Sequence, residues 1–209
     1  IRGVGPEVWN DWKGALIKEL YIKTYDLLKP NQEISQITEP LKTSKELLVR
    51  YLNKKGLNDL DIKMYCSKFY SNYWSMFNLS SIINHHEIFT EMKNSNKKLE
   101  IYLSNDSKLK ATELLVITPD HHGLFSQISG LVASSGYDIV SAKIITRSDG
   151  YALDTFFLQN THRKPISDNN YRKKLIETIT QGLEGNFNIE KALNNKWEEI
   201  PARFRAVKA

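Results

Sequence analysis

The feature that most constrains the fold is a change in the spacing of apolar residues near residue 112. Before this point apolar residues recur at helical spacing, as in the stretches 44–56 and 60–77. After it, 114–117 is a continuous apolar run, and 139–146 alternates apolar and polar residues as a half-buried strand does. The sequence therefore predicts an α+β protein with a helical first half and a sheet in the second half.

The second half is predicted to fold in the order βαββαβ. The first strand, at 114–117, precedes a helix that ends at Gly136, and the turn "RSDG" then separates two strands. Ser167 or Asp168 is expected to cap a second helix, and "ARFRAVK" near the end of the chain is the expected fourth strand. This order is typical of a small antiparallel sheet with two helices on one face. The helical core positions are Leu124, Ile128, Leu131, Val132, Leu175, Ile176, Ile179 and Leu183.

The expected organisation is a helical region at 1–95, a linker at 96–112 and an α+β domain at 113–209. The linker is expected because the stretch "YLSNDSKLKATE" is mostly polar. In the helical region, a first helix is expected to begin near Pro6, and one helix is expected to run through 60–77. The second of these needs a partner surface, because its predicted face is rich in aromatic residues: Met64, Tyr65, Phe69, Tyr73 and Phe77.

Composition excludes several classes of protein. The chain has 209 residues, of which 41% are hydrophobic, so it can form real cores. Its only cysteine, Cys66, excludes a disulfide framework, and no apolar run approaches the roughly 20 residues of a membrane span. The net charge of +5 comes from lysines scattered among acidic residues, which does not favour nucleic-acid binding. We expect a cytoplasmic protein without nucleic-acid or membrane partners, cut from a longer chain because it begins with Ile1.

The polar turn "TPDHHGL", at 118–124, is the main candidate for a binding site. A helix start presents unpaired amides and a partial positive charge, which attract a carboxylate, and glycine allows a ligand to approach the backbone closely. An aspartate here can accept a hydrogen bond from an ammonium group, and the strand that follows the helix can offer edge carbonyls and amides. The sequence therefore predicts a site for the charged ends of an amino acid at Asp120, His121, His122, Gly123, Leu124, Asp138, Ile139 and Val140.

Other interpretations of the polar residues stay open at this point. Asp120 could merely cap the helix while His121 and His122 are solvated, or these three residues could hold zinc, although they lack the ligand spacing of a structural site. Asp154 and His122 could mimic an acid and base pair, but no nucleophile accompanies them. The adjacent His85 and His86 are expected to be a solvated or half-buried pair on a helix. None of these patterns by itself predicts catalysis.

Two stretches resemble a known family. "VITPDHHGLFSQISGLVASSGYDIVSAKI" followed by "TRSDGYALDTFFLQ" is similar to an ACT regulatory domain, whose turn commonly reads Asp-Arg-Pro-Gly-Leu. It most resembles the first of two such domains in the bifunctional PII uridylyltransferase/uridylyl-removing enzymes. The opening "IRGVGPEVWNDWKGALIKELY" resembles the stretch that follows the last aspartate of the HD phosphohydrolase domain in the same family. The two motifs occur in the family's order, and between them the resemblance covers most of the chain.

The resemblance implies a ferredoxin-like ACT fold that binds glutamine as an effector. The parent enzyme would uridylylate the signal protein PII when glutamine is scarce and remove the modification when it is abundant. The parent would need magnesium or manganese, whereas this part would hold no cofactor and catalyse neither reaction. His121 and His122 stand where Arg and Pro are commoner, and Ser141 replaces a usual Asp, so ligand identity stays open. Pairing of ACT domains is expected, and the alternative is an interaction or dimerisation module without its own ligand.

Overall fold

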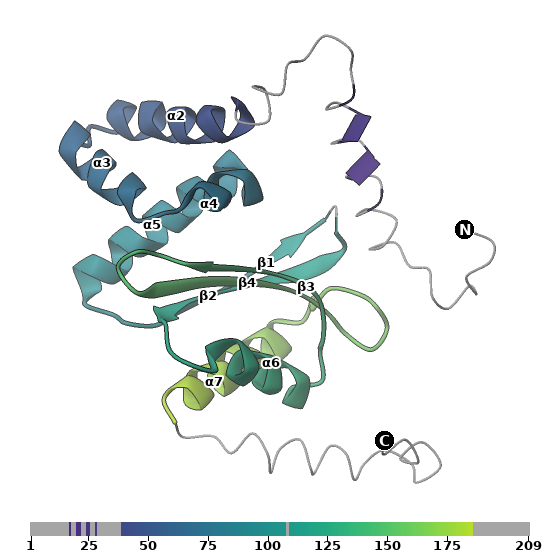
Figure 1. Ribbon diagram of the computed structural model, residues 1–209. Coiled ribbons are helices and arrows are strands. Elements are labelled where there is room, and N and C mark those ends of the chain that lie inside the picture. The colour runs from purple at the N-terminus through teal and green to yellow at the C-terminus, as the bar shows by residue number, and fades with distance from the viewer. Residues whose placement is uncertain are drawn as a thin grey trace, which may run out of the picture. The chain divides into compact units, whose positions relative to one another are not determined.

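The computed structural model describes residues 39–107 and 109–185, together with isolated residues between 17 and 28 (Figure 1). The expected helix start near Pro6 and the expected strand "ARFRAVK" lie outside the described residues. Within residues 39–107 and 109–185, four helices come first, and a four-stranded sheet with two further helices follows. In chain order the elements are α2 (Glu39–Lys54), α3 (Asp59–Ser67), α4 (Ser71–Met76), α5 (Leu79–Ser95), β1 (Glu100–Asp106), β2 (Ala111–Pro119), α6 (Leu124–Ser134), β3 (Asp138–Thr146), β4 (Tyr151–Gln159) and α7 (Asn169–Leu183).

Helices α3 and α4 occupy the stretch in which one continuous helix was expected. Helix α3 ends at Ser67, and Tyr70 takes an extended conformation with φ of −77° and ψ of 167° before α4 begins. The rings of Phe69 and Tyr73 stack with their centroids 3.9 Å apart, and Phe69 also packs edge-on against Phe89 of α5, with centroids 6.3 Å apart. Met64, expected on the inner face, is half-exposed at 50%. Tertiary packing of aromatic rings therefore overrides the local helical pattern here.

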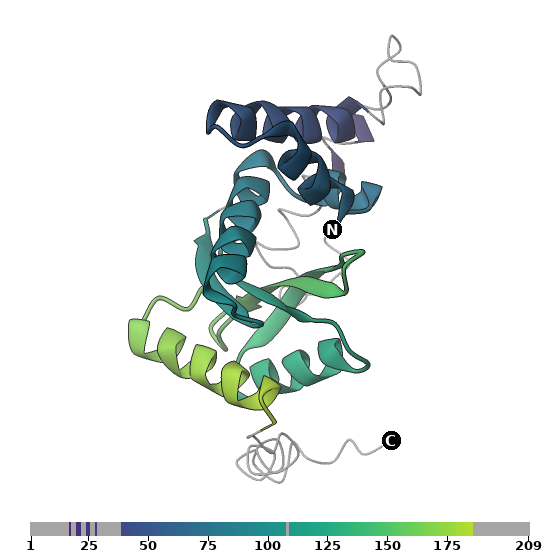
Figure 2. The ribbon, with the colours of Figure 1, turned by 90° about the vertical axis from the view of Figure 1, so that its left-hand side faces the viewer.

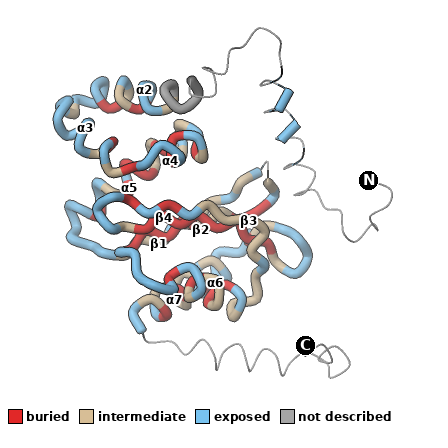
Figure 3. Tube along the Cα trace, viewed as in Figure 1, coloured by how far each residue is buried: buried red, intermediate tan, exposed pale blue. Residues whose placement is uncertain are grey.

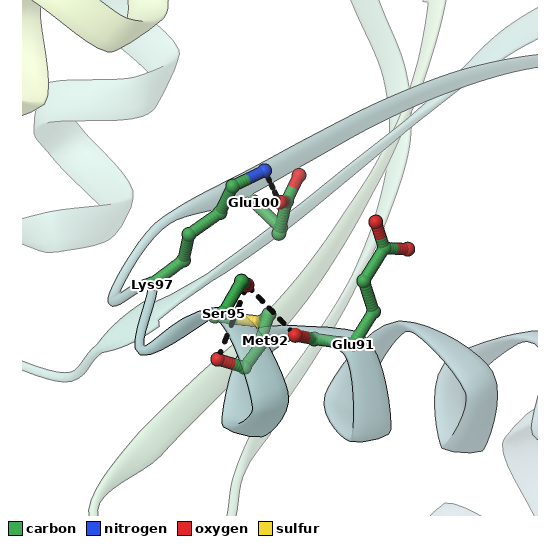
Figure 4. A network of polar contacts seen from close by, with 5 residues as sticks. All are labelled: Glu91, Met92, Ser95, Lys97 and Glu100. Atoms are coloured by element: carbon green, nitrogen blue, oxygen red, sulfur yellow. Dashed lines mark hydrogen bonds and ion pairs between the residues drawn. The ribbon is translucent and has the colours of Figure 1, made fainter.

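The end of α5 is fixed by a local network of polar contacts (Figure 4). The hydroxyl of Ser95 donates to the carbonyl of Glu91 at 2.7 Å, and Asn96 follows in the left-handed conformation with φ of 53°. The backbone amide of Lys97 then donates to the carbonyl of Met92 at 3.1 Å, which closes the last turn. The Lys97 ammonium pairs with Glu100 at 2.6 Å, at the first residue of β1. These contacts turn the chain from the helix into the sheet.

The sheet has the strand order β1-β2-β4-β3, with β2 and β4 in the centre. Figure 3 shows buried residues concentrated along these two strands, as expected from their apolar runs. Strand β1, at one edge, lies inside the stretch 96–112 that we expected to be a linker. It is held beside β2 by side chains as well as backbone, since Ser104 donates to Glu113 at 3.0 Å and Thr112 donates to Asn105 at 3.0 Å.

The stretch 96–112 contains β1 although its composition is polar, because a half-exposed edge strand needs few apolar residues. The rest of the predicted α+β class is confirmed, with helices first and a sheet with two helices second. The capping prediction is confirmed for α7, where the carboxylate of Asp168 accepts from the amide of Asn170 at 2.7 Å. Ile176 is half-buried and not a core residue, whereas Leu175 and Ile179 are buried.

Helices α6 and α7 lie side by side in Figure 2 and pack closely. The side-chain amide of Gln127 on α6 donates to the carbonyl of Gly182 on α7 at 2.8 Å. Gly182 lies against the side chain of Leu131, so that an added Cβ would meet the Leu131 Cγ at 2.9 Å. The absence of a side chain at Gly182 therefore sets how closely the two helices approach.

The described chain forms two compact units. One contains α2 to α5 together with 117–119 and 143–153, and the other contains α6, α7 and the remaining parts of the sheet. The turn between β3 and β4 therefore belongs with the helices and not with α6 and α7. The division into domains at 1–95 and 113–209 stays a prediction.

Candidate functional site

The turn between β2 and α6 holds the residues that the sequence singled out. Asp120, His121, His122 and Gly123 are all exposed, whereas Leu124 is buried as the first residue of the helix. Gly123 is the N-cap of α6 in the left-handed conformation, with φ of 82° and ψ of 2°. A Cβ added to Gly123 would meet nothing within 4 Å. The turn is thus open, and glycine is required by the backbone conformation and not by a close neighbour in this chain.

The start of α6 has the features of an anion site. Its N-cap residue has no side chain, and the amide of Leu124 is used locally by donating to the carbonyl of His121 at 3.2 Å. The next two amides, of Phe125 and Ser126, belong to the first turn and have no acceptor within the helix. They lie at the positive end of the helix dipole, which favours a carboxylate or phosphate. The arrangement suits a ligand with a negatively charged end.

One of the two histidines of the turn contacts the backbone of the turn. The Nδ1 atom of His121 lies 3.1 Å from the carbonyl oxygen of His122, so one imidazole is engaged with the turn itself. Among residues 39–107 and 109–185, no group of three or more His, Cys, Asp or Glu residues could hold a metal ion. The zinc interpretation of Asp120, His121 and His122 therefore has no support from the described geometry.

The strand residues predicted for the same site lie at the other end of α6. The amides of Gly136 and Tyr137 donate to the carbonyls of Ala133 and Val132, so β3 begins beside the last turn of the helix. Helix α6 has 11 residues, which corresponds to a length of about 16 Å. Asp138, at the start of β3, is therefore separated from the turn by the length of the helix. Ile139 and Val140 follow it on this edge strand and are half-buried.

The comparisons with known proteins give one consistent result. No family model matches the chain. The bifunctional uridylyltransferase/uridylyl-removing enzyme of Rhodospirillum rubrum is 31% identical over 205 residues, which are 98% of this chain and 22% of that enzyme. The enzymes of the same name from Nitrobacter winogradskyi and Rhodopseudomonas palustris are 32% and 31% identical, over 88% and 92% of this chain and 20% and 21% of those enzymes.

This similarity identifies the chain as part of the bifunctional uridylyltransferase/uridylyl-removing enzyme family. The chain spans about one fifth of the length of the curated relatives that it matches. In the part of the family that this chain represents, the structure has helices followed by an α+β sheet of the ACT type. None of the helices in the described residues is long and apolar enough to cross a membrane.

In this member of the family, His85 and His86 are buried and not solvated or half-buried as expected. His85 is 1% exposed, and its Nδ1 atom lies 3.0 Å from the hydroxyl of Tyr73. Burial and the nearby charge of Lys143 lower the pKa of His85 to about 3, and burial lowers the pKa of His86. The expectation failed because the spacing of two adjacent histidines does not reveal the aromatic residues that pack around them in the folded chain.

A cleft that the sequence did not suggest lies in the same unit as α6. It has a volume of about 570 Å³ and is lined by the end of α6, the loop after β4 and the first turns of α7. Its lining includes Tyr137, His162 and Tyr171. Most of these positions come from loops and helix ends, which have no periodic pattern, so no sequence signal would have found the cleft. It does not include the residues of the turn at 120–124.

Proposed function

We propose that this chain is the regulatory, glutamine-sensing part of a cytoplasmic bifunctional uridylyltransferase/uridylyl-removing enzyme that acts on the signal protein PII. The similarity to such enzymes over nearly the whole chain supports this assignment. The magnesium or manganese expected for the larger enzyme serves its catalytic parts, and this part performs no transfer or hydrolysis by itself. The alternative is an interaction or dimerisation module that has no ligand of its own.

The observation that carries the proposal is the open turn at the start of α6. The carboxylate of glutamine would accept hydrogen bonds from the amides of Phe125 and Ser126, where the helix dipole favours an anion by about 0.3 to 1 kcal/mol. Gly123 leaves the approach unobstructed, because no side chain projects from it. The ammonium group of glutamine would be bound by the exposed carboxylate of Asp120. Both charged ends of the amino acid thus have a complementary partner in one turn.

The side-chain amide of glutamine needs both a donor and an acceptor, which an exposed strand edge provides. Asp138, Ile139 and Val140 lie on the edge strand β3, but at the far end of α6 from the turn. We therefore propose that the strand edge at one site comes from a second ACT unit, either in the longer chain or in a second copy. A site completed in this way would bind glutamine weakly in a single unit and tightly in a pair.

Calorimetry with glutamine on the full-length enzyme tests this proposal. Asp120→Asn should weaken binding by about 1 kcal/mol, which is roughly fivefold in Kd, because an exposed charge-assisted hydrogen bond is lost. Asp59→Asn is the matched control, since Asp59 is likewise exposed near the start of a helix but lies on α3. Asp59→Asn should leave the Kd unchanged. Equal affinity in the two variants would show that Asp120 does not contact the ligand.

A second pair of variants separates steric blocking from backbone strain. Gly123→Val should abolish glutamine binding, because the new side chain occupies the approach to the amides. Any residue with a side chain is strained at this φ of 82°, so Gly150→Val is the control, with φ of 81° and equally open surroundings. The two changes should cost similar stability, but only Gly123→Val should affect binding. If none of the twenty standard amino acids raises the melting temperature of the wild-type enzyme, the alternative function, an interaction or dimerisation module without its own ligand, is supported instead.

A further inference from the structure

The helical unit contains a cluster of aromatic side chains that meets the hairpin formed by β3 and β4. We define the aromatic cluster as Tyr65, Phe69, Tyr73, Phe77, His85 and Phe89, which come from α3, α4, α5 and the segments between them. Its rings contact one another with centroid separations from 3.9 to 6.5 Å. Residues 143–153 of the hairpin belong to the same compact unit. The hairpin is therefore one of the partner surfaces of the aromatic residues in 60–77, together with the neighbouring helices.

Arg147, directly after β3, enters this cluster. The residue is only 8% exposed, and its guanidinium carbon lies 3.7 Å from the ring centroid of Phe89 and 5.0 Å from that of Phe69. Its Nε and Nη2 atoms donate to the two carboxylate oxygens of Asp149 at 3.0 and 2.8 Å. The guanidinium carbon also lies 5.7 Å from the ring centroid of Tyr65, so the arginine combines a bidentate ion pair with cation–π contacts on three rings.

Two further contacts hold the hairpin to the same helices. The ammonium of Lys143, on β3, donates to the carbonyl of Met76 at 2.8 Å and lies 4.9 Å from the ring centroid of Phe77. The amide of Ser148, in the turn, donates to the carbonyl of Lys68 at 2.9 Å. The hairpin is therefore attached at the end of α3, at the end of α4 and among the rings, through two cations and one backbone amide.

The contact made by Arg147 is not optimised for stability alone. Its Nη1 atom is buried and has no hydrogen-bond acceptor among the residues that the structure describes. A buried charged donor without an acceptor keeps part of its desolvation penalty, which release into water would recover. An apolar side chain at this position could fill the cluster without that penalty. The unpaired Nη1 therefore favours release of Arg147 into water, whereas the ion pair and the ring contacts favour its burial, and such opposing terms suit a conformational switch.

We propose that Arg147 and Lys143 form a latch that couples the β3–β4 hairpin to helices α3, α4 and α5. Strand β3 begins at Asp138 in the region assigned to the glutamine site and ends at Thr146, next to the latch, so a displacement of the strand changes the fit of Arg147 among the rings. The regulatory part of this inference rests on the proposed function. The structural part, that Arg147 holds the hairpin on the helices, does not depend on glutamine.

Hydrogen exchange in the full-length enzyme tests the structural part. Arg147→Met keeps an unbranched stem but removes the charge, and it should speed exchange of the Ser148 amide at least tenfold. Arg147→Lys keeps the charge but loses the bidentate pair, and it should give an intermediate rate. Arg50→Met is the control, because Arg50 is an exposed arginine on α2. It should leave the exchange unchanged. If the Ser148 amide stays protected from exchange in Arg147→Met, the proposal that Arg147 holds the hairpin on the helices is refuted.

Glutamine titrations of the same variants test the coupling. Arg147→Met should bind glutamine within twofold of the wild-type Kd, but the change in uridylyl-removing rate on adding glutamine should fall towards none. If that response is retained while Ser148 has lost protection, the hairpin is anchored by Arg147 but does not carry the signal, and the coupling is refuted. If the wild type itself does not bind glutamine, the proposed function fails, and the exchange data still decide the latch. If Arg147→Met does not fold, Arg147→Lys decides both parts.

Discussion

Acidification should destabilise this protein through the buried His85. The folded state lowers the pKa of His85 to about 3, because the ring is buried and Lys143 is near. The unfolded chain has an ordinary histidine pKa of about 6.5, so below that pH the unfolded state binds a proton that the folded state excludes. At neutral pH His85 therefore costs the folded state no stability. The free energy of unfolding falls as the pH is lowered from about 6.5 towards about 3.

The size of the effect at pH 5 follows from the unfolded pKa alone, since pH 5 lies well above the folded value. Each pH unit below about 6.5 costs about 1.4 kcal/mol, so His85 accounts for a loss of about 2 kcal/mol between pH 7 and pH 5. A loss of this size is a large fraction of the stability of an ordinary domain, which is about 5 to 15 kcal/mol. Carboxylates and His86 also titrate on acidification, so the contribution of His85 must be isolated by substitution.

His85→Gln isolates this contribution, because glutamine does not titrate and can still form a hydrogen bond with Tyr73. Urea unfolding at pH 7, 6 and 5 gives the free energy of unfolding of each protein. The advantage of the wild type over the variant should shrink by about 2 kcal/mol from pH 7 to pH 5. His162→Gln, which replaces an exposed histidine in the loop before α7, is the control. A wild-type advantage that is the same at pH 7 and pH 5 would refute the reasoning.

Two further predictions concern the packing of α6 and α7. Gly182→Ala should destabilise the protein by about 1 kcal/mol in urea unfolding, because the new methyl group meets Leu131. The cost of this overpacking exceeds the gain in helix propensity from glycine to alanine. A variant more stable than the wild type would show that the two helices can move apart at little cost. Asp168→Ala should cost about 1 kcal/mol by removing the N-cap of α7, whereas Asp168→Asn, which keeps an acceptor, should cost less. Equal losses in these two variants would show that the carboxylate acts through its charge and not as a cap.

The sequence by itself determined the elements whose signals are local. Helix α6 follows from the spacing of Leu124, Ile128 and Leu131, and its end follows from Gly136, whose φ is 90°. The cap of α7 at Asp168 and the location of β2 around the apolar run 114–117 likewise follow from residues within a few positions of each element. These features could be predicted because helix periodicity, capping and continuous apolar runs depend on chain neighbours.

Part of the candidate site could be predicted in the same way. The turn at 120–124 was located because a polar cluster with a glycine stands between an apolar run and a helix. The distance between this turn and Asp138 was not predicted. Helix α6 runs away from the turn for its whole length, so the strand that follows it begins at the opposite end of the helix. The strand edge and the turn therefore lie close in the sequence but at opposite ends of α6.

Only the tertiary structure decided the features that depend on distant partners. Strand β1 forms because β2 offers it an edge, although its own residues are mostly polar. The rings of Phe69 and Phe77 pack against Phe89 and His85 of α5, and His85 becomes neutral and buried because rings surround it. Arg147 enters the same cluster from a hairpin far along the chain. In each case the energy comes from burial and contacts between residues well separated in the chain, to which a local pattern is insensitive.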